Sequence, residues 1–260
     1  MQLKVRGIDT FVATGGREFD RSQPSVVLLH GAGFDHTTWA LHSRWFAHHG
    51  FNVLAPDLPG HGRSSGAPLP TIADMADWTA ALLDTAGAGK AKLVGHSMGS
   101  LIALETAARH PAKVSALSLI GTAATMTVGP DLLKAAEAND QTAIDMVSIW
   151  GLGFQAELGG SLAPGLWMHA GAQRVLEKCR PGVLFNDLSA CNAYQGALAA
   201  AAQISVPVTL ILGERDMMTP AKAGKTLAAA LPNSRTVVLP GAGHMMMVER
   251  PDELLAALQG

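Results

Sequence analysis

The chain has 260 residues, of which 48% are hydrophobic and 15% charged, so it can bury a large core. A formal net charge of −2, with no Lys- or Arg-rich segment, argues against nucleic acid or an anionic membrane surface as a partner. We find no signal-peptide pattern and no apolar run of membrane-spanning length, and therefore expect a cytoplasmic protein. Cys179 and Cys191 are the only cysteines, and we expect both to be reduced.

Apolar strands alternate with helical patterns along most of the chain. Taken in order, we predict a hairpin at 2–14, a strand at 24–33, a helix at 36–50, a strand beginning at 51, a helix at 71–87, a strand at 92–96, a helix at 98–109, strands at 114–123, 206–216 and 234–243, and helices at 220–231 and 248–258. Within the helix at 71–87, Thr71 is the expected N-cap and Gly87 the expected stop. Near-continuous apolar strands alternating with helices indicate an α/β fold with a parallel sheet covered on both faces.

Residues 124–203 break this alternation. They have helix-like patterns and carry large apolar side chains, among them Trp150, Phe154, Trp167 and Met168. We interpret them as a helical insertion, so that 1–123 and 204–260 form the core and 124–203 form a cap over it.

The segment "GHSMG", residues 95–99, lies where a predicted strand turns into a predicted helix. A Gly-x-Ser-x-Gly pattern alone is weak, but this strand–turn–helix context is the one in which it presents a nucleophile. The turn would strain the backbone of Ser97, and side chains at positions 95 and 99 would crowd it, which explains the two glycines. We therefore predict that Ser97 is a nucleophile at the N-terminus of a helix.

A serine nucleophile needs a base, and the base needs a partner that fixes its tautomer. His244 follows the last predicted strand in a glycine-containing loop, and Asp216 follows the strand before it. Glu214 competes with Asp216 for the acid role, but Asp216 is favoured because it lies beyond the strand. We predict the catalytic triad Ser97, His244 and Asp216.

The segment "LLHGAG", residues 28–33, ends another apolar strand in a glycine-containing loop. Such a loop lets a backbone N–H approach a substrate oxygen. We predict that the N–H groups of Ala32 and Met98 form the oxyanion hole, with Gly33 as the alternative donor. The side chain of His30 is expected to brace the loop.

With these motifs in order, the chain resembles the α/β-hydrolase superfamily over nearly its whole length. The matching segments are "HGAG" (30–33), "DLPGHGRS" (57–64), "GHSMG" (95–99), "GERD" (213–216) and "GAGH" (241–244). The resemblance implies a mostly parallel eight-stranded sheet with a helical cap inserted after the sixth strand. It also implies the nucleophile at Ser97, the acid at Asp216 and the base at His244, with Asp57, His61 and Arg63 as structural braces.

Because this fold hosts many chemistries, the function must be argued from the site. Ser97 stands where the resemblance places an aspartate in haloalkane dehalogenases and epoxide hydrolases, which excludes both. We predict a carboxylesterase-like serine hydrolase that cleaves esters with apolar acyl or alcohol groups, including polyester or lipid-like esters. The alternatives are a carbon–carbon bond hydrolase of the aromatic-degradation type and a non-catalytic ligand receptor on the same fold.

The expected ligand is a small-molecule or polymeric ester, and the oligomeric state is left open. We predict that Trp150, Trp167, Met168 and Met245 line the substrate pocket, since they are large apolar residues in the insertion or next to the base. No His-Glu-x-x-His or Cys–His spacing indicates a metal, and we expect no cofactor.

Overall fold

A computed structural model describes residues 1–160 and 166–259 of the chain. It contains an eight-stranded sheet in the order β1-β2-β4-β3-β5-β6-β7-β8. The strands are β1 (Gln2–Val5), β2 (Ile8–Ala13), β3 (Ser25–Leu29), β4 (Asn52–Pro56), β5 (Ala91–His96), β6 (Val114–Ile120), β7 (Val208–Gly213) and β8 (Ser234–Leu239). The hairpin strands β1 and β2 pair antiparallel, and β2 also pairs antiparallel with β4. The six strands β3 to β8 are parallel. The predicted fold class, a mostly parallel eight-stranded α/β-hydrolase sheet, is confirmed.

Helices connect the parallel strands. They are η1 (His36–Trp39), α1 (Ala40–His48), α2 (Ile72–Ala86), α3 (Met98–Arg109), η2 (Pro111–Lys113), α4 (Pro130–Glu137), α5 (Gln141–Trp150), α6 (Phe154–Glu157), α7 (Met168–Glu177), α8 (Val183–Ala193), α9 (Ala197–Ala201), α10 (Ala221–Ala229), α11 (Met246–Glu249) and α12 (Pro251–Gln259). None of the helices in the described ranges is long and apolar enough to cross a bilayer.

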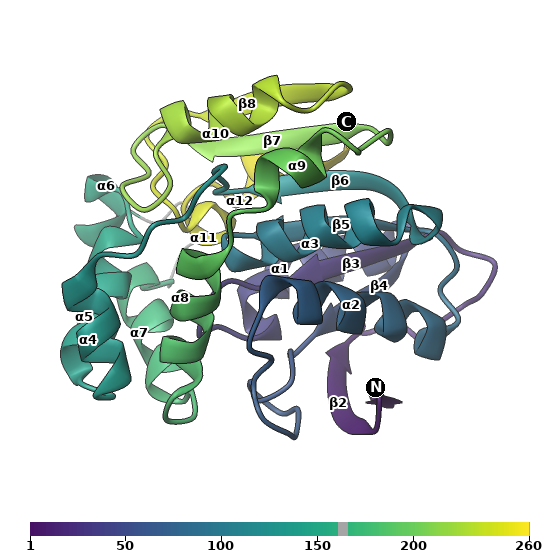
Figure 1. Cartoon of the computed structure of the whole chain (residues 1–260), viewed down its shortest axis with the longest axis horizontal. Helices are drawn as coiled ribbons and strands as arrows, with labels where there is room; N and C mark the ends of the chain where they lie inside the picture. Colours follow the sequence, from purple (N-terminus) through teal and green to yellow (C-terminus); the bar gives the residue numbers. More distant parts are fainter. Residues whose placement is uncertain (161–165, 260) are drawn as a thin grey trace.

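The helices form a layer on each face of the sheet. On one face, α2 and α3 pack against each other and on the strands, and α9 and α10 extend this layer toward β7 and β8. On the other face, α1 and α12 contact the sheet and each other (Figure 1). The central strands are buried on both sides, which explains their near-continuous apolar sequences.

Local sequence signals place several helix ends as expected. The Thr71 hydroxyl accepts a hydrogen bond from the Asp74 N–H at 3.0 Å, and Gly87 closes α2 with a φ of 67°. The predicted single helix at 248–258 is wrong, because Pro251 lacks an N–H and begins a new helix after α11. The predicted helix at 36–50 likewise begins as a separate 3₁₀ turn, capped by the Asp35 carboxylate.

Helices α4 to α9 all lie within residues 124–203. Figure 1 shows α4 to α8 gathered beyond one end of the sheet. The short helix α9 differs, because it contacts α3 and α10 and its alanines belong to the core on that face of the sheet. Of the predicted insertion, only α4 to α8 are therefore placed to cover a site at the strand ends. The division of the chain into core and cap stays a prediction.

Candidate active site

Ser97 lies between β5 and α3, at the corner where the strand turns into the helix. Its φ is 53°, a left-handed conformation that is strained for a residue with a Cβ atom. A Cβ atom on Gly95 would lie 2.0 Å from the Gly99 carbonyl oxygen, and one on Gly99 would lie 2.4 Å from the Leu29 oxygen. Both positions therefore require glycine, because the helix start approaches the strands at backbone contact distance.

His244 and Asp216 come together beside this corner. The Nδ1 atom of His244 lies 2.8 Å from Oδ2 of Asp216, with both side chains almost fully buried. The other ring nitrogen, Nε2, is buried and has no hydrogen-bond partner within the part of the chain that the structure describes. Nδ1–H donation to Asp216 leaves a lone pair on Nε2, which is the protonation state of a general base.

Asp216 accepts several hydrogen bonds besides the one from His244. Its Oδ1 accepts from the N–H groups of Met218 at 2.9 Å and Thr219 at 2.7 Å, and its Oδ2 accepts from the Thr219 hydroxyl at 2.8 Å. Burial raises the pKa of Asp216, but His244 and these donors lower it more, so the carboxylate stays charged. The competing acid, Glu214, is exposed and accepts from the Gly241 N–H instead. Sequence reasoning missed Thr219.

The loop that carries His244 is held by a residue that the motifs did not indicate. Glu249 is buried, and its Oε2 accepts from the N–H groups of Gly153 and Gly243, both at 2.9 Å. Its Oε1 accepts from the Met245 N–H at 3.1 Å. The two residues on either side of His244 thus bind one carboxylate, which fixes the backbone around His244.

Hydrogen bonds to the Gly31 carbonyl group orient the loop after β3. Gly31 O accepts from Phe34 N–H at 3.2 Å and lies 2.9 Å from Nδ1 of His30. Burial lowers the pKa of His30 to about 4, and its Nε2 accepts from the Leu58 N–H, so Nδ1 carries the proton. Because C=O and N–H point in opposite directions across a trans peptide, the Ala32 N–H points away from these donors. His30 braces the loop, as expected.

The other two candidate donors differ in availability. Met98 is the first residue of α3, where N–H groups have no acceptor within the helix. Gly33 does not serve as the alternative donor, because its N–H donates to Oδ2 of Asp187 at 2.9 Å. Ala32 lines the same pocket as Ser97.

The segment 57–64 braces the region under the loop. Oδ2 of Asp57 accepts from the Arg63 N–H, and Oδ1 accepts from the His36 N–H, both at 2.8 Å. Nε2 of His61 lies 2.7 Å from Oδ2 of Asp187 on α8, a buried ion pair that no sequence motif indicated. Asp35, His36 and Asp57 lie close enough to hold a metal ion, but these atoms already bind one another or backbone N–H groups, and we assign no metal to them.

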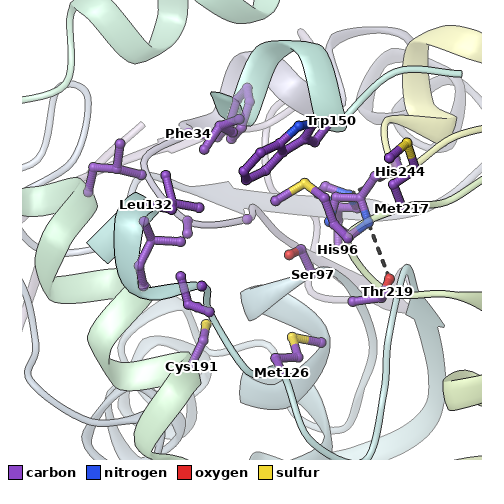
Figure 2. A pocket seen from close by; sticks show the side chains of 18 of the residues that line it. Phe34, His96, Ser97, Met126, Leu132, Trp150, Cys191, Met217, Thr219 and His244 are labelled. Atoms are coloured by element: carbon purple, nitrogen blue, oxygen red, sulfur yellow. Dashed lines mark hydrogen bonds between the residues drawn. The ribbon is translucent and has the colours of Figure 1, made fainter. Parts of the chain in front are cut away.

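A cavity of about 240 Å³ opens above Ser97 (Figure 2). Its apolar lining consists of Ala32, Phe34, Met126, Val128, Leu132, Val147, Trp150, Leu184, Leu188, Met217, Met218 and Met245, and Cys191 also faces it. Trp150 and Met245 line this cavity as predicted. Trp167 and Met168 do not: Trp167 is 66% exposed ahead of α7, and Met168 is buried in the core cluster without lining the cavity. Residue type alone did not distinguish these two residues from the apolar residues that do line the cavity.

Comparisons with known proteins show which family the chain resembles. A family model described as "Alpha/beta hydrolase family" matches residues 26–258. A pimeloyl-(acyl-carrier protein) methyl ester esterase of Chromobacterium violaceum is 33% identical over 249 residues, covering 90% of this chain and 92% of that protein. The crystal structure of the enol-lactonase from Burkholderia xenovorans LB400 superposes with a TM-score of 0.89 at 25% identity, covering 100% of this chain and 98% of that one. A thermophilic esterase superposes with a TM-score of 0.80 at 28% identity, covering 100% and 95%.

Proposed function

The chain belongs to the alpha/beta hydrolase family and is an ester-hydrolysing enzyme, and we propose that Ser97, His244 and Asp216 are its catalytic triad. The observation that carries the proposal is the geometry of His244. Its Nδ1 lies 2.8 Å from the Asp216 carboxylate, and its Nε2 is buried with no partner in the described ranges. His244 and Ser97 line the same cavity. Catalytic hydrogen bonds are often long before substrate binds, so a free Nε2 is compatible with a base that awaits its substrate.

In the proposed mechanism, Nε2 of His244 takes the proton from the Ser97 hydroxyl as Oγ attacks the ester carbonyl carbon. The carbonyl π electrons move to the oxygen, which becomes the oxyanion of a tetrahedral intermediate. When this collapses, His244 returns the proton to the departing alcohol, and an acyl-enzyme remains on Ser97. A water molecule, deprotonated by His244, then releases the acid by the same steps.

The N–H groups of Ala32 and Met98 are the proposed donors to the oxyanion. Ala32 is supported by the orientation of the Gly31 carbonyl, and Met98 by its place in the first turn of α3. The start of a helix also favours developing negative charge through its dipole. Loss of one such donor typically lowers kcat by about 10²- to 10³-fold.

The apolar lining of the cavity supports substrates with an apolar acyl or alcohol group. The Chromobacterium violaceum relative is named for the hydrolysis of a methyl ester on an acyl group, which combines a small alcohol with a longer acyl chain. We extend the proposal to small-molecule esters and to polyester or lipid-like esters whose chain ends enter the cavity. Helices α4 to α8 would act as its cap, and the two free cysteines support a cytoplasmic location.

The test is steady-state hydrolysis of p-nitrophenyl esters, from acetate to laurate, by the wild type and by Ser97→Ala. We expect repeated turnover by the wild type and a loss of at least about 10³-fold in the variant. Ser22→Ala, at an exposed serine, is the matched control. Full activity of Ser97→Ala would overturn the triad. Faster cleavage of a vinylogous diketone than of any ester would favour a carbon–carbon hydrolase, and retention of ligand without turnover would favour a receptor.

A further inference from the structure

We propose that Asp187 of α8 is a positioning residue for the oxyanion hole, acting through Gly33 and kept charged by His61. The inference rests on the proposed function, in which the N–H of the neighbouring Ala32 is an oxyanion donor. The inference connects the wall of the substrate cavity with the loop after β3. Neither the sequence motifs nor the proposed triad require such a connection.

The charge state of the pair follows from its contacts. The side chains of His61 and Asp187 are 1% and 0% exposed. Nδ1 of His61 lies 3.0 Å from the Pro59 carbonyl oxygen, and Nε2 lies 2.7 Å from Oδ2 of Asp187. Both ring nitrogens therefore face oxygen atoms. Burial lowers the pKa of His61, but Asp187 and these hydrogen bonds raise it more, which favours a proton on each nitrogen. His61 is an imidazolium ion, and Asp187 is the carboxylate that compensates it.

The same carboxylate oxygen holds the oxyanion loop. Oδ2 of Asp187 accepts from the Gly33 N–H at 2.9 Å, across 154 positions of sequence. Because the acceptor is charged, this hydrogen bond is stronger than one to a neutral oxygen would be. The hydrogen bond to Asp187 thus fixes the Ala32–Gly33 peptide. The Gly31–Ala32 peptide is fixed by the two donors to its carbonyl oxygen, His30 Nδ1 and the Phe34 N–H. The Ala32 N–H belongs to the Gly31–Ala32 peptide, and its position is therefore fixed from both sides of residue 32.

Packing at Gly33 reinforces the link. Its φ is +72°, and a Cβ atom there would lie 2.9 Å from Leu184 Cδ1 and 3.0 Å from Leu176 Cδ2. Helices α7 and α8 therefore lie directly on the loop. The hydrogen bond and the close packing act on one residue, so the loop cannot shift without moving α8.

Helix α8 also forms one wall of the cavity. Leu184, Leu188 and Cys191 line it from successive turns, and Asp187 lies between the first two of these. The helix that would contact the acyl chain is therefore the helix that anchors the oxyanion loop. A defect in the anchor should reduce stabilisation of the transition state more than it reduces binding of the ester.

The experiment compares Asp187→Asn with the wild type. We expect kcat on the preferred p-nitrophenyl ester to fall by about 10- to 100-fold, because small displacements of a catalytic group have effects of this size. KM should change by less than about twofold, since ground-state contacts remain. The matched control is Asp145→Asn, which removes the charge of a carboxylate on α5 and should leave kcat and KM unchanged.

An alkyl trifluoromethyl ketone separates positioning from stability. Ser97 Oγ adds to its carbonyl carbon, the proton passes to His244, and the carbonyl oxygen becomes an oxyanion in the hole. We expect its inhibition constant to rise in Asp187→Asn by the same factor by which kcat/KM falls. A lower thermal midpoint with kcat and this inhibition constant unchanged would show that Asp187 is only structural, and would overturn the inference.

A second variant covers the case in which Asp187→Asn does not fold. His61→Gln combined with Asp187→Asn replaces the ion pair by two neutral amides that can still hydrogen bond, so no buried charge is left alone. We expect this variant to fold and to show the same reduction in kcat and in ketone affinity. Wild-type values in the folded double variant would also overturn the inference. Failure of the proposed function gives a different result, because Ser97→Ala would then retain turnover.

Discussion

The carboxylate of Glu249 accepts a hydrogen bond from the N–H of Gly153 at 2.9 Å, which joins α11 to the start of α6 across 96 positions of sequence. The same side chain accepts from the N–H groups on either side of His244. One buried carboxylate therefore connects the loop that carries His244 to the start of α6. Its position five residues after the base makes it a support for the proposed triad, and it can be tested separately from the chemistry.

Glu249→Gln should destabilise the protein by about 1–3 kcal/mol, because the amide can accept on one side only and its NH₂ must face an N–H donor on the other. Urea unfolding measures the change. Glu253→Gln, at an exposed position of α12, is the matched control and should stay within about 0.5 kcal/mol of the wild type. Equal stability of the two variants would mean that the three N–H groups find other acceptors.

Asp216 and Glu214 offer a direct comparison of two carboxylates at the end of one strand. Asp216→Asn should lower kcat by about 10³- to 10⁴-fold, because an amide in this place favours the wrong tautomer of His244; an analogous change in a serine protease sets this scale. Glu214→Gln should change kcat by less than about twofold, since Glu214 is exposed and binds only the Gly241 N–H. Steady-state hydrolysis of one ester by both variants decides between them. A larger loss in Glu214→Gln would transfer the acid role to Glu214.

The corner at Ser97 requires space that only glycine leaves. Gly99→Ala places a Cβ atom 2.4 Å from the Leu29 carbonyl oxygen, a backbone atom that cannot turn aside. We expect a loss of about 3 kcal/mol or more in stability, together with loss of activity. Gly171→Ala is the control: this helical glycine of α7 has open space around its Cβ position, so alanine should stabilise the protein by about 0.5–1 kcal/mol. Chemical denaturation of both variants provides the comparison.

Three buried histidines predict how stability depends on pH. Burial lowers the pKa of His30 and His42 to about 4 and that of His96 to about 3. In the unfolded chain a histidine has a pKa of about 6.5, so below that pH the unfolded state takes up protons that the folded state does not. Stability should therefore fall as the pH drops from about 6.5 toward 4, by up to about 1.4 kcal/mol per pH unit for each histidine.

His61 affects the pH dependence of stability in the opposite direction, because its pKa is raised. Burial lowers this pKa, but Asp187 and two hydrogen bonds raise it more. Its contribution is complete below about pH 6.5 and is lost as the pH rises through the raised value. Urea unfolding between pH 4 and 9 measures both slopes.

His42→Gln, far along the chain from the proposed triad, should reduce the number of protons taken up on unfolding at acidic pH by about one. It should leave kcat unchanged. Stability that stays constant from pH 6.5 to 5 would contradict the assignment of neutral buried histidines.

The residues that the sequence identified are those with a local signature. The strained corner needs Gly95, Ser97 and Gly99 within five positions, and the residues of the proposed triad each lie at or just after the end of a predicted strand, so a pattern along the chain indicates them. Asp187 and Glu249 have no such signature. Asp187 binds the Gly33 N–H across 154 positions, and Glu249 binds the Gly153 N–H across 96. A carboxylate in an apolar helix looks the same in sequence whether it faces solvent or buried N–H groups.

Trp150 and Trp167 show that sequence alone also does not determine which apolar residues line the cavity. Comparing variants of the two residues tests the lining directly. Both are large apolar residues of the insertion, yet Trp150 lines the cavity and Trp167 is 66% exposed. Trp150→Ala removes the indole from the cavity wall, which should cost about 1–3 kcal/mol of apolar contact with a filling acyl group and raise KM by about 10-fold or more. The enlarged cavity should also shift the preferred p-nitrophenyl ester to a longer acyl chain. Trp167→Ala should leave KM and the chain-length preference as in the wild type. If the two variants have the same chain-length profile, the acyl group does not bind against Trp150.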